Sequence, residues 1–121
     1  MNNKFFIFLS ATLVVLYAYS SMGKGLITSE MARRMIRTGE IGTVVDVRTL
    51  AEWKLGHYKG ARHIPSGSLT PGKFVYTPYN TGILVYCNTG QRARAAAEKI
   101  RGFGFTNVYY IKGGYWTLLK S

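Results

Sequence analysis

Residues 82–100 read GILVYCNTGQRARAAAEKI, and the architecture expected for the whole chain follows from this run. Its first five residues are apolar and rich in β-forming side chains, so they predict a buried strand. The alanine-rich run from Gln91 onward predicts a helix. The loop between them begins with Cys87, the only cysteine in the chain. The thiol is therefore predicted to lie where a strand ends and a helix begins.

The composition of this loop is typical of an anion-binding cradle. A helix N-terminus leaves backbone N–H groups unpaired and carries about half a positive charge, which favours a thiolate or an anionic sulfur there. Gly90 permits a strongly curved backbone, and Arg92 adds a fixed charge. The alternative is an inert cysteine in the core, because free cysteines are among the most buried residues. We favour a nucleophilic Cys87, with a substrate held by Asn88, Thr89, Gly90, Gln91 and Arg92.

Apolar runs and helical stretches alternate through the rest of the chain and predict an α/β fold. Ser29 or Thr28 should cap a helix that runs to Arg37, and residues 43–47, with three valines, should form a buried parallel strand. Further elements are expected as a short helix or turn at 52–54, strands at 62–64, 82–86 and 107–111, and helices at 91–102 and 114–119. Residues 66–81 hold two prolines and two glycines and are predicted to be loop. This order implies a mostly parallel sheet with helices on both faces, and places Cys87 at a carboxyl edge, where such sheets bind ligands.

Several short motifs occur in an order that resembles the single-domain rhodaneses, which are sulfurtransferases with a persulfide on the loop cysteine. The motifs are Asp46-Val47-Arg48, Glu52-Trp53, Gly56-His57, Gly60-Ala61-Arg62-His63-Ile64-Pro65, the Cys87 loop and Gly113-Gly114-Tyr115-Trp116. The resemblance covers residues 26–119. One departure is His63, where the family often has asparagine.

The resemblance implies a reaction, and the length of the loop indicates which one. In rhodaneses the loop is sized for sulfur, whereas the related phosphatases and arsenate reductases have a C-x5-R loop that is one residue longer. Cys87 to Arg92 is C-x4-R. We therefore expect transfer of sulfur from thiosulfate or a persulfide, through Cys87, to cyanide or a thiol. A persulfide-carrying module with little turnover and, less favoured, a phosphatase or arsenate reductase remain as alternatives.

Three charged residues upstream of the loop have two possible roles. Asp46 and Arg48 follow a buried strand and could line the site, or Arg48 could pair with Glu52 and fix the next turn. We predict a structural role for Asp46 and Glu52, because buried charges are seldom left unpaired, and a substrate-binding role for Arg48. His57 and His63 are expected to make hydrogen bonds in turns. They are six residues apart without a second cysteine or an acidic cluster, so neither a metal nor another cofactor is expected.

The N-terminal segment predicts export. Residues 5–23 carry no charge and follow a single lysine, Lys4. The run is close to the length of a membrane span, and small residues near position 20 are typical of a signal-peptide cleavage site. We predict that residues 1–20 form a signal peptide or a membrane anchor, and that residues 21–121 form one rhodanese-like domain, periplasmic or otherwise extracytoplasmic, and monomeric.

The net charge of +11 favours anionic partners. Nucleic acid is the competing interpretation, but no nucleic-acid-binding motif accompanies the basic residues, which are spread over different predicted helices. A small anionic sulfur donor, with a basic surface near anionic lipid, is the preferred interpretation. The lone cysteine has no resolving partner in the chain, so a persulfide on it needs an external acceptor.

Overall fold

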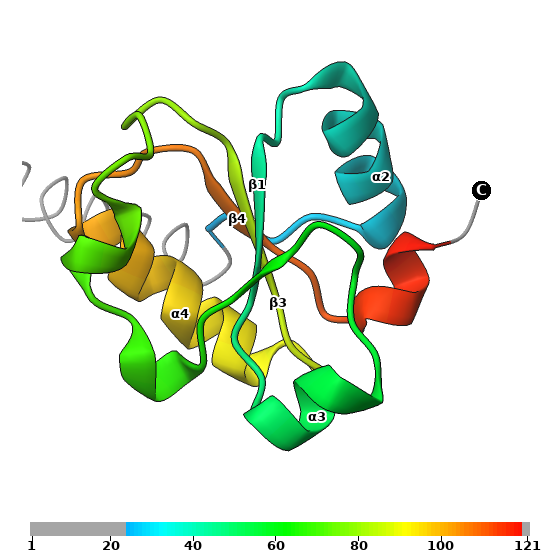
Figure 1. The fold of residues 1–121 in the computed structure, drawn as a ribbon. Helices are drawn as coiled ribbons and strands as arrows, with labels where there is room; N and C mark the ends of the chain where they lie inside the picture. The colour runs from blue at the N-terminus through cyan, green and yellow to red at the C-terminus, as the bar shows by residue number, and fades with distance from the viewer. Residues whose placement is uncertain (1–23, 120–121) are drawn as a thin grey trace, which may run out of the picture.

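The computed structural model describes residues 24–119, which fold around a four-stranded parallel sheet with the strand order β2-β1-β3-β4 (Figure 1). The strands are β1 (Thr43–Asp46), β2 (Arg62–His63), β3 (Ile83–Tyr86) and β4 (Val108–Tyr110). The central pair β1 and β3 is in register from Thr43 opposite Ile83 to Asp46 opposite Tyr86. Because the strands are parallel, the residues that follow β1 and β3 meet at one edge of the sheet.

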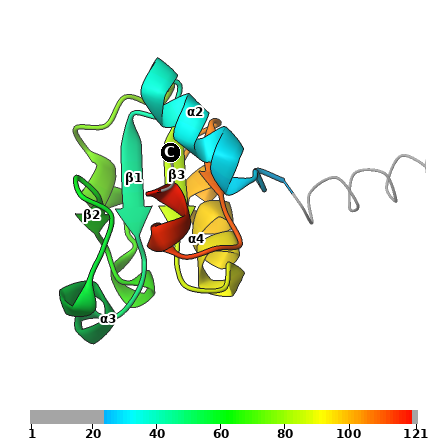
Figure 2. The same ribbon diagram turned by 90° about the vertical axis from the view of Figure 1, so that its right-hand side faces the viewer.

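Helices cover both faces of this sheet, as predicted. The α-helices are α2 (Ser29–Thr38), α3 (Leu50–Leu55) and α4 (Gln91–Gly102). Three 3₁₀ helices accompany them, η1 (Ser66–Ser68), η2 (Pro71–Phe74) and η3 (Tyr115–Leu118). Helix α4 lies on one side of the sheet and α2 on the other, while α3 lies beyond the carboxyl end of β1 (Figures 1 and 2).

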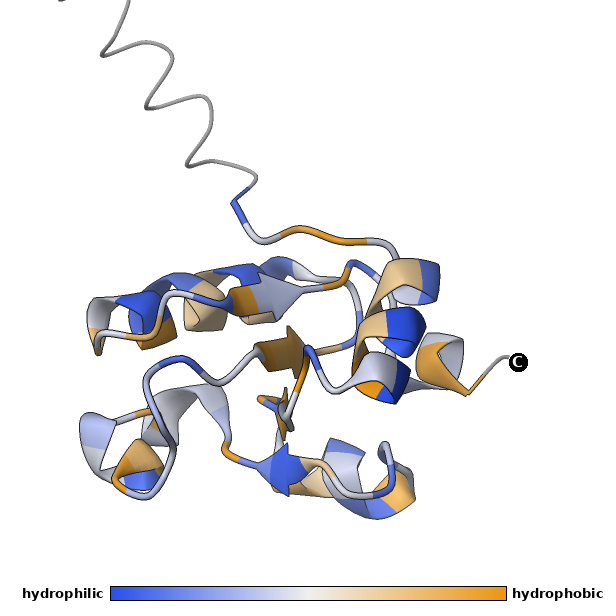
Figure 3. Ribbon diagram, turned by 90° about the horizontal axis from the view of Figure 1, so that it is seen from above, coloured by the Kyte–Doolittle hydropathy of each residue, from blue (hydrophilic) through white to orange (hydrophobic). Residues whose placement is uncertain are grey.

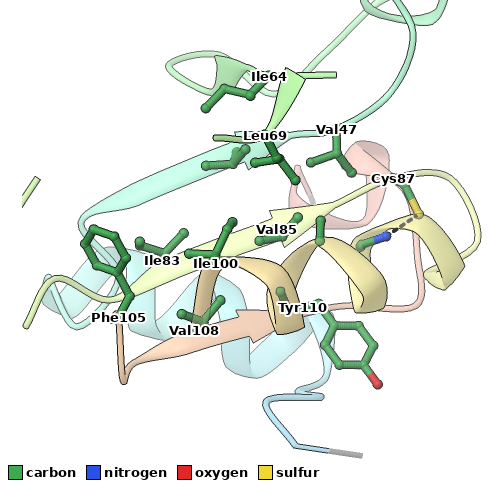
Figure 4. Close-up of a cluster of buried hydrophobic side chains, with 14 of the residues drawn as sticks. Val47, Ile64, Leu69, Ile83, Val85, Cys87, Ile100, Phe105, Val108 and Tyr110 are labelled. Carbon is green, nitrogen blue, oxygen red and sulfur yellow. Dashed lines mark hydrogen bonds between the residues drawn. The ribbon is translucent and has the colours of Figure 1, made fainter. Parts of the chain in front are cut away.

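Successive side chains of a strand point to opposite faces of the sheet, so the interior is divided into two hydrophobic cores. Ile83 and Val85 pack with α4 in one core (Figure 4). Val45 belongs to the same core. Val44 and Leu84 pack with α2 and η3 in the other. Figure 3 shows an apolar strand in the middle of the molecule, between helices that carry many of the hydrophilic residues. The Ile-Leu-Val-Tyr run of β3 is buried throughout because it has helices on both sides.

Side-chain caps set where the first two described helices begin. The hydroxyl of Thr28 accepts the N–H of Met31, so Thr28 rather than Ser29 is the N-cap of α2. Thr49 and Glu52 form a capping box at the start of α3, in which each side chain accepts the backbone N–H of the other residue. The predicted short helix at 52–54 therefore exists and begins two residues earlier, at Leu50.

The loop predicted for residues 66–81 is wrong in part, since it contains η1 and η2. Pro71 lies in the first turn of η2, where its missing N–H costs nothing. Leu69 and Phe74 are buried in the same core as α4. These two apolar side chains anchor a segment whose glycines and prolines indicated only turns.

The predicted leader, residues 1–20, and its uncharged run 5–23 lie outside the described residues. Within residues 24–119, no helix has both the length and the apolar composition to cross a membrane. The first described residues pair with the sheet edge, because Leu26 forms a parallel bridge with Tyr110 of β4.

Candidate active site

Cys87 follows β3 directly, and its sulfur lies at the N-terminus of α4. The Sγ atom accepts hydrogen bonds from the backbone N–H of Gly90, at 3.1 Å, and of Ala93, at 3.4 Å. Figure 4 shows the side chain beside the first turn of α4. Two donors of a helix N-terminus thus point at this sulfur, an arrangement that stabilises negative charge on it. The side chain is fully buried, so the thiol is both a member of the core and the acceptor of a helix terminus.

Gly90 produces the curvature that brings these donors inward. It is the N-cap of α4 and has φ 94°, in the left-handed region that favours glycine. A Cβ at this position would lie 2.9 Å from the Cα of Lys112, so the loop also packs closely against the segment after β4. No side chain caps α4, and the sulfur of Cys87 receives the N–H groups that a cap would bind.

Glu52 of α3 binds the other side of the loop. Its carboxylate accepts two hydrogen bonds from the guanidinium of Arg92, at 2.7 and 2.9 Å, and one from the side-chain amide of Asn88. The Arg92 hydrogen bond, with that of Thr49, holds the pKa of Glu52 well below its usual range. The same contact raises the pKa of Arg92. Glu52 and two of the predicted loop residues, Asn88 and Arg92, therefore form one cluster.

Arg48 does not pair with Glu52, so that interpretation of the sequence is wrong. Its Nη2 lies 2.9 Å from Oδ2 of Asp46, both side chains are buried, and the backbone N–H of Arg48 also donates to Oδ1 of Asp46 at 2.8 Å. Since only one residue separates the two, a tight turn after β1 is enough to join them. The guanidinium also donates to the carbonyl of Gly56 and lies 5.2 Å from the ring centre of Tyr115.

Tyr86, the last residue of β3, completes this buried polar group. The Arg48 guanidinium lies 5.7 Å from its ring centre, and its hydroxyl accepts the N–H of Tyr58 at 3.0 Å. Burial, together with the Asp46 carboxylate, raises the pKa of Tyr86. The phenol is therefore neutral, and its hydroxyl is hydrogen-bonded to the backbone of Tyr58.

Most of the predicted site residues lie together, but their surroundings differ. Thr89 and Gln91 are exposed, and neither side chain has a described hydrogen bond to the cysteine. Asn88 and Thr89 line a pocket of about 420 Å³ beside the loop, together with Arg48 and Glu52. Leu55, Gly56, Tyr115 and Trp116 form its remaining wall. Sequence reasoning missed Leu55, Tyr115 and Trp116 as site residues; the Gly-Gly-Tyr-Trp motif was the signal that pointed to the last two.

Both histidines make backbone hydrogen bonds, as predicted. His57 Nδ1 lies 2.9 Å from the carbonyl of Trp53, and His63 Nε2 lies 2.8 Å from the carbonyl of Arg48. The indole of Trp53 stacks on both rings, with centroid distances of 3.4 Å to His57 and 4.7 Å to His63. In the described part of the chain no three His, Cys, Asp or Glu side chains gather as metal ligands would.

The comparison with protein families gives one match across residues 28–118, described as Rhodanese-like domain. This covers most of the chain and all of the site above. The chain belongs to the rhodanese-like family. The α/β fold with its parallel sheet is consequently that of the family, as the sequence motifs implied.

Among its relatives is the thiosulfate sulfurtransferase GlpE of Ectopseudomonas mendocina, which is 30% identical over 89 residues, or 74% of this chain and 79% of the relative. The probable adenylyltransferase/sulfurtransferase MoeZ of Mycobacterium tuberculosis is 29% identical over 89 residues, and there the chain spans only 23% of the relative's length. The human single-domain sulfurtransferase TSTD1 has a TM-score of 0.62 at 23% identity, over 82% of this chain and 100% of that one, which shows the same fold. The rhodanese-like domain thus has relatives named as sulfurtransferases, and it spans most of the length of GlpE and about a quarter of the length of MoeZ.

Proposed function

We propose that the rhodanese-like domain is a sulfurtransferase that moves sulfane sulfur through a persulfide on Cys87. The observation that carries this proposal is the Sγ atom at the N-terminus of α4, with two backbone N–H groups directed at it. Such donors stabilise a thiolate before reaction and a negatively charged persulfide after it. The C-x4-R loop and the relatives named as sulfurtransferases support the same chemistry.

The proposed reaction has two steps. The Cys87 thiolate attacks the outer sulfur of a donor such as thiosulfate, the S–S bond of the donor breaks, and sulfite leaves with the electron pair. A thiophilic acceptor, cyanide or a thiol, then attacks the outer sulfur of the persulfide and releases Cys87 as a thiolate. Enzyme and substrate thus exchange sulfur in a ping-pong scheme. Gly90 and the loop N–H groups serve both steps because the negative charge stays on sulfur, first on Sγ of Cys87 and then on the outer sulfur of the persulfide.

Intact mass of the purified protein tests the cycle directly. Thiosulfate should add the mass of one sulfur atom, and cyanide should remove it with release of thiocyanate. If the reduced protein gains no sulfur from thiosulfate, or from an organic persulfide tried next, the proposed function is wrong. Hydrolysis of p-nitrophenyl phosphate by the same preparation would instead favour the phosphatase alternative.

Replacement of the nucleophile gives the first prediction. Cys87→Ser should take up no sulfur and release no thiocyanate, because the hydroxyl is not ionised at neutral pH and forms no persulfide. The serine oxygen can still accept the N–H groups of Gly90 and Ala93, so the circular-dichroism spectrum and the unfolding midpoint should remain close to those of the wild type. Thiocyanate release by a folded Cys87→Ser protein would contradict the mechanism.

A persulfide-carrying module with little turnover is the second candidate, and the burial of Cys87 favours it. A side chain with 0% exposure must become accessible before either partner can react. Loading or unloading that is slow with the small molecules thiosulfate and cyanide would identify a carrier that depends on protein partners, whereas fast loading and unloading would identify a free-standing enzyme.

Export of the domain is proposed on the sequence alone, from the uncharged run of residues 5–23. Fusion of a reporter that is active only outside the cytoplasm to the C-terminus of the full chain tests it. A silent reporter on a stably expressed fusion would contradict export, and the mass of the mature protein would show whether the segment is cleaved.

A further inference from the structure

The pocket beside the Cys87 loop is larger and less polar than the transfer of a small anion requires. Its volume is about 420 Å³, within the range of pockets that hold organic ligands. Asn88 and Thr89, the two residues after Cys87 in the sequence, are among its lining residues. Leu55, Tyr115 and Trp116 line the same pocket. The pocket is therefore a place where an organic molecule can lie against the loop.

The charges that line this pocket are already neutralised. Only Arg48 and Glu52 of its lining residues are charged. Arg48 pairs with buried Asp46 at 2.9 Å, and Glu52 binds Arg92 through two hydrogen bonds. The arginine that the loop motif assigns to anion binding is thus bound to a carboxylate of α3. The cation in the lining of this pocket, Arg48, already has a carboxylate partner. An anionic substrate would therefore find no unpaired positive charge among the described lining residues.

The apolar side chains of the same pocket are, in contrast, left uncovered. Leu55 is 89% exposed and Trp116 is 51% exposed. Tyr115 and Trp116 meet edge to face, with ring centroids 5.6 Å apart, and so present an aromatic corner. Apolar surface of this kind is stabilised when a ligand covers it, and aromatic rings favour an aromatic or hydrocarbon partner.

We infer that the sulfur acceptor of this site is an organic thiol of low molar mass with an apolar, preferably aromatic, body that lies against Leu55, Tyr115 and Trp116. The inference rests on the proposed function and specifies its second step. The acceptor thiolate attacks the outer sulfur of the Cys87 persulfide, the S–S bond of the persulfide breaks, and the electron pair leaves with Cys87. The products are the organic persulfide and the free thiolate of the protein, and no further oxidant or reductant is needed.

A single-turnover experiment tests this acceptor class. The protein is first loaded with sulfur and checked by intact mass, and the persulfide is then unloaded with 2-phenylethanethiol, 2-mercaptoethanol or cyanide at equal concentrations of the reactive anion. The aromatic thiol should unload Cys87 about tenfold faster than 2-mercaptoethanol, the scale expected from burial of a few methylene-sized groups. Cyanide serves as the reference because it has no body to bind.

Leu55→Ser and the matched control Val75→Ser distinguish the pocket from a general effect of surface polarity. Leu55 is 89% exposed and Val75 is 68% exposed, so neither substitution opens a cavity in the core. Val75 does not line the pocket. The ratio of the rate with 2-phenylethanethiol to the rate with cyanide should fall several-fold in Leu55→Ser and stay at the wild-type value in Val75→Ser. Trp116→Ala should change the ratio in the same direction as Leu55→Ser.

The possible failures are distinguishable. If Cys87 takes no sulfur from any donor, the proposed function is wrong and this inference falls with it. If Cys87 is loaded but both thiols unload it equally, or Leu55→Ser and Val75→Ser behave alike, only the acceptor assignment is wrong. Equal unloading would show that the uncovered apolar side chains do not bind the acceptor thiol.

Discussion

Glu52 joins two parts of the site that lie far apart in the sequence, the start of α3 and the cysteine loop. It caps α3 together with Thr49, and it accepts hydrogen bonds from Arg92 and Asn88 of the cysteine loop. Its low pKa means that folding favours the charged carboxylate. A group of this kind stabilises the fold fully above its pKa in the unfolded chain, and the contribution is lost as the pH falls below that value toward the pKa in the fold.

Glu52→Gln should therefore destabilise the protein in a pH-dependent way. At pH 7 we expect a loss of about 1–2 kcal/mol in the free energy of unfolding, since the pair is bidentate but in contact with solvent. The difference from the wild type should shrink as the pH falls from about 6 to 3 in urea titrations, because the wild-type carboxylate becomes protonated in the unfolded chain over that range.

Glu98→Gln is the matched control for this carboxylate. Glu98 lies 3.8 Å from Arg94 on the surface of α4, and its side chain is 54% exposed. Its replacement should change stability by less than about 0.5 kcal/mol at any pH. Equal losses for the two variants, or a loss at Glu52 that does not vary with pH, would contradict the role assigned to the cluster.

At the scale of elements, two glycines in the left-handed region lie at helix ends but meet different surroundings. Gly39 ends α2 with φ 84°, and a Cβ there would contact nothing within 4 Å. Gly90 begins α4 with φ 94°, and a Cβ there would lie 2.9 Å from the Cα of Lys112. Both positions require the left-handed backbone, but only Gly90 also requires the absence of a side chain.

Substitution of these glycines separates backbone strain from close packing. Gly39→Ala should cost about 1 kcal/mol, from the left-handed backbone alone, whereas Gly90→Ala should cost about 3 kcal/mol because the loop must also move away from Lys112. That movement withdraws the Gly90 N–H from Cys87, so sulfur loading should slow in Gly90→Ala and not in Gly39→Ala. Urea unfolding and the rate of mass gain measure the two effects. Equal costs would show that the loop does not depend on its packing against the segment after β4.

At the scale of the whole molecule, 16 basic and 5 acidic residues give a net charge of +11. Such a charge attracts small anions over distances comparable to the Debye length, even though the guanidiniums in the site are paired with carboxylates. Long-range attraction then acts on the arrival of an anionic donor, while the apolar pocket acts on the acceptor once it is bound.

The second-order rate of loading by thiosulfate should consequently fall by several-fold between about 20 mM and 500 mM salt. The rate at which 2-phenylethanethiol unloads the Cys87 persulfide, at fixed thiolate concentration, should depend less on salt than the loading rate, because the pocket binds the uncharged part of this acceptor. Unfolding midpoints measured at both salt concentrations control for changes in the fold. A loading rate independent of salt would show that the positive charge does not steer the donor.

Elements formed by neighbouring residues could be predicted from the sequence. The buried run of β3, the valines of β1 and the alanine-rich α4 appear within one or two residues of their predicted bounds, because periodicity and propensity act over a few positions. The Cys87 loop was predicted on the same basis, since a strand, a glycine and a helix N-terminus are contiguous. Residues 66–81 were harder, because Leu69 and Phe74 enter the core only once α4 is in place.

Pairings between distant residues were decided by the tertiary structure alone. Arg92 and Asn88 reach Glu52 across 40 and 36 positions, and no local pattern distinguishes that arrangement from a pair between Glu52 and Arg48. The apolar pocket likewise exists only where α3 and η3 approach the loop. The sequence therefore determined the elements, the family and the position of Cys87 between a strand and a helix, because these depend on short-range patterns and motifs. The partner of each charge and the walls around the sulfur depend on how the parallel strands bring their carboxyl ends to one edge, which only the folded chain defines.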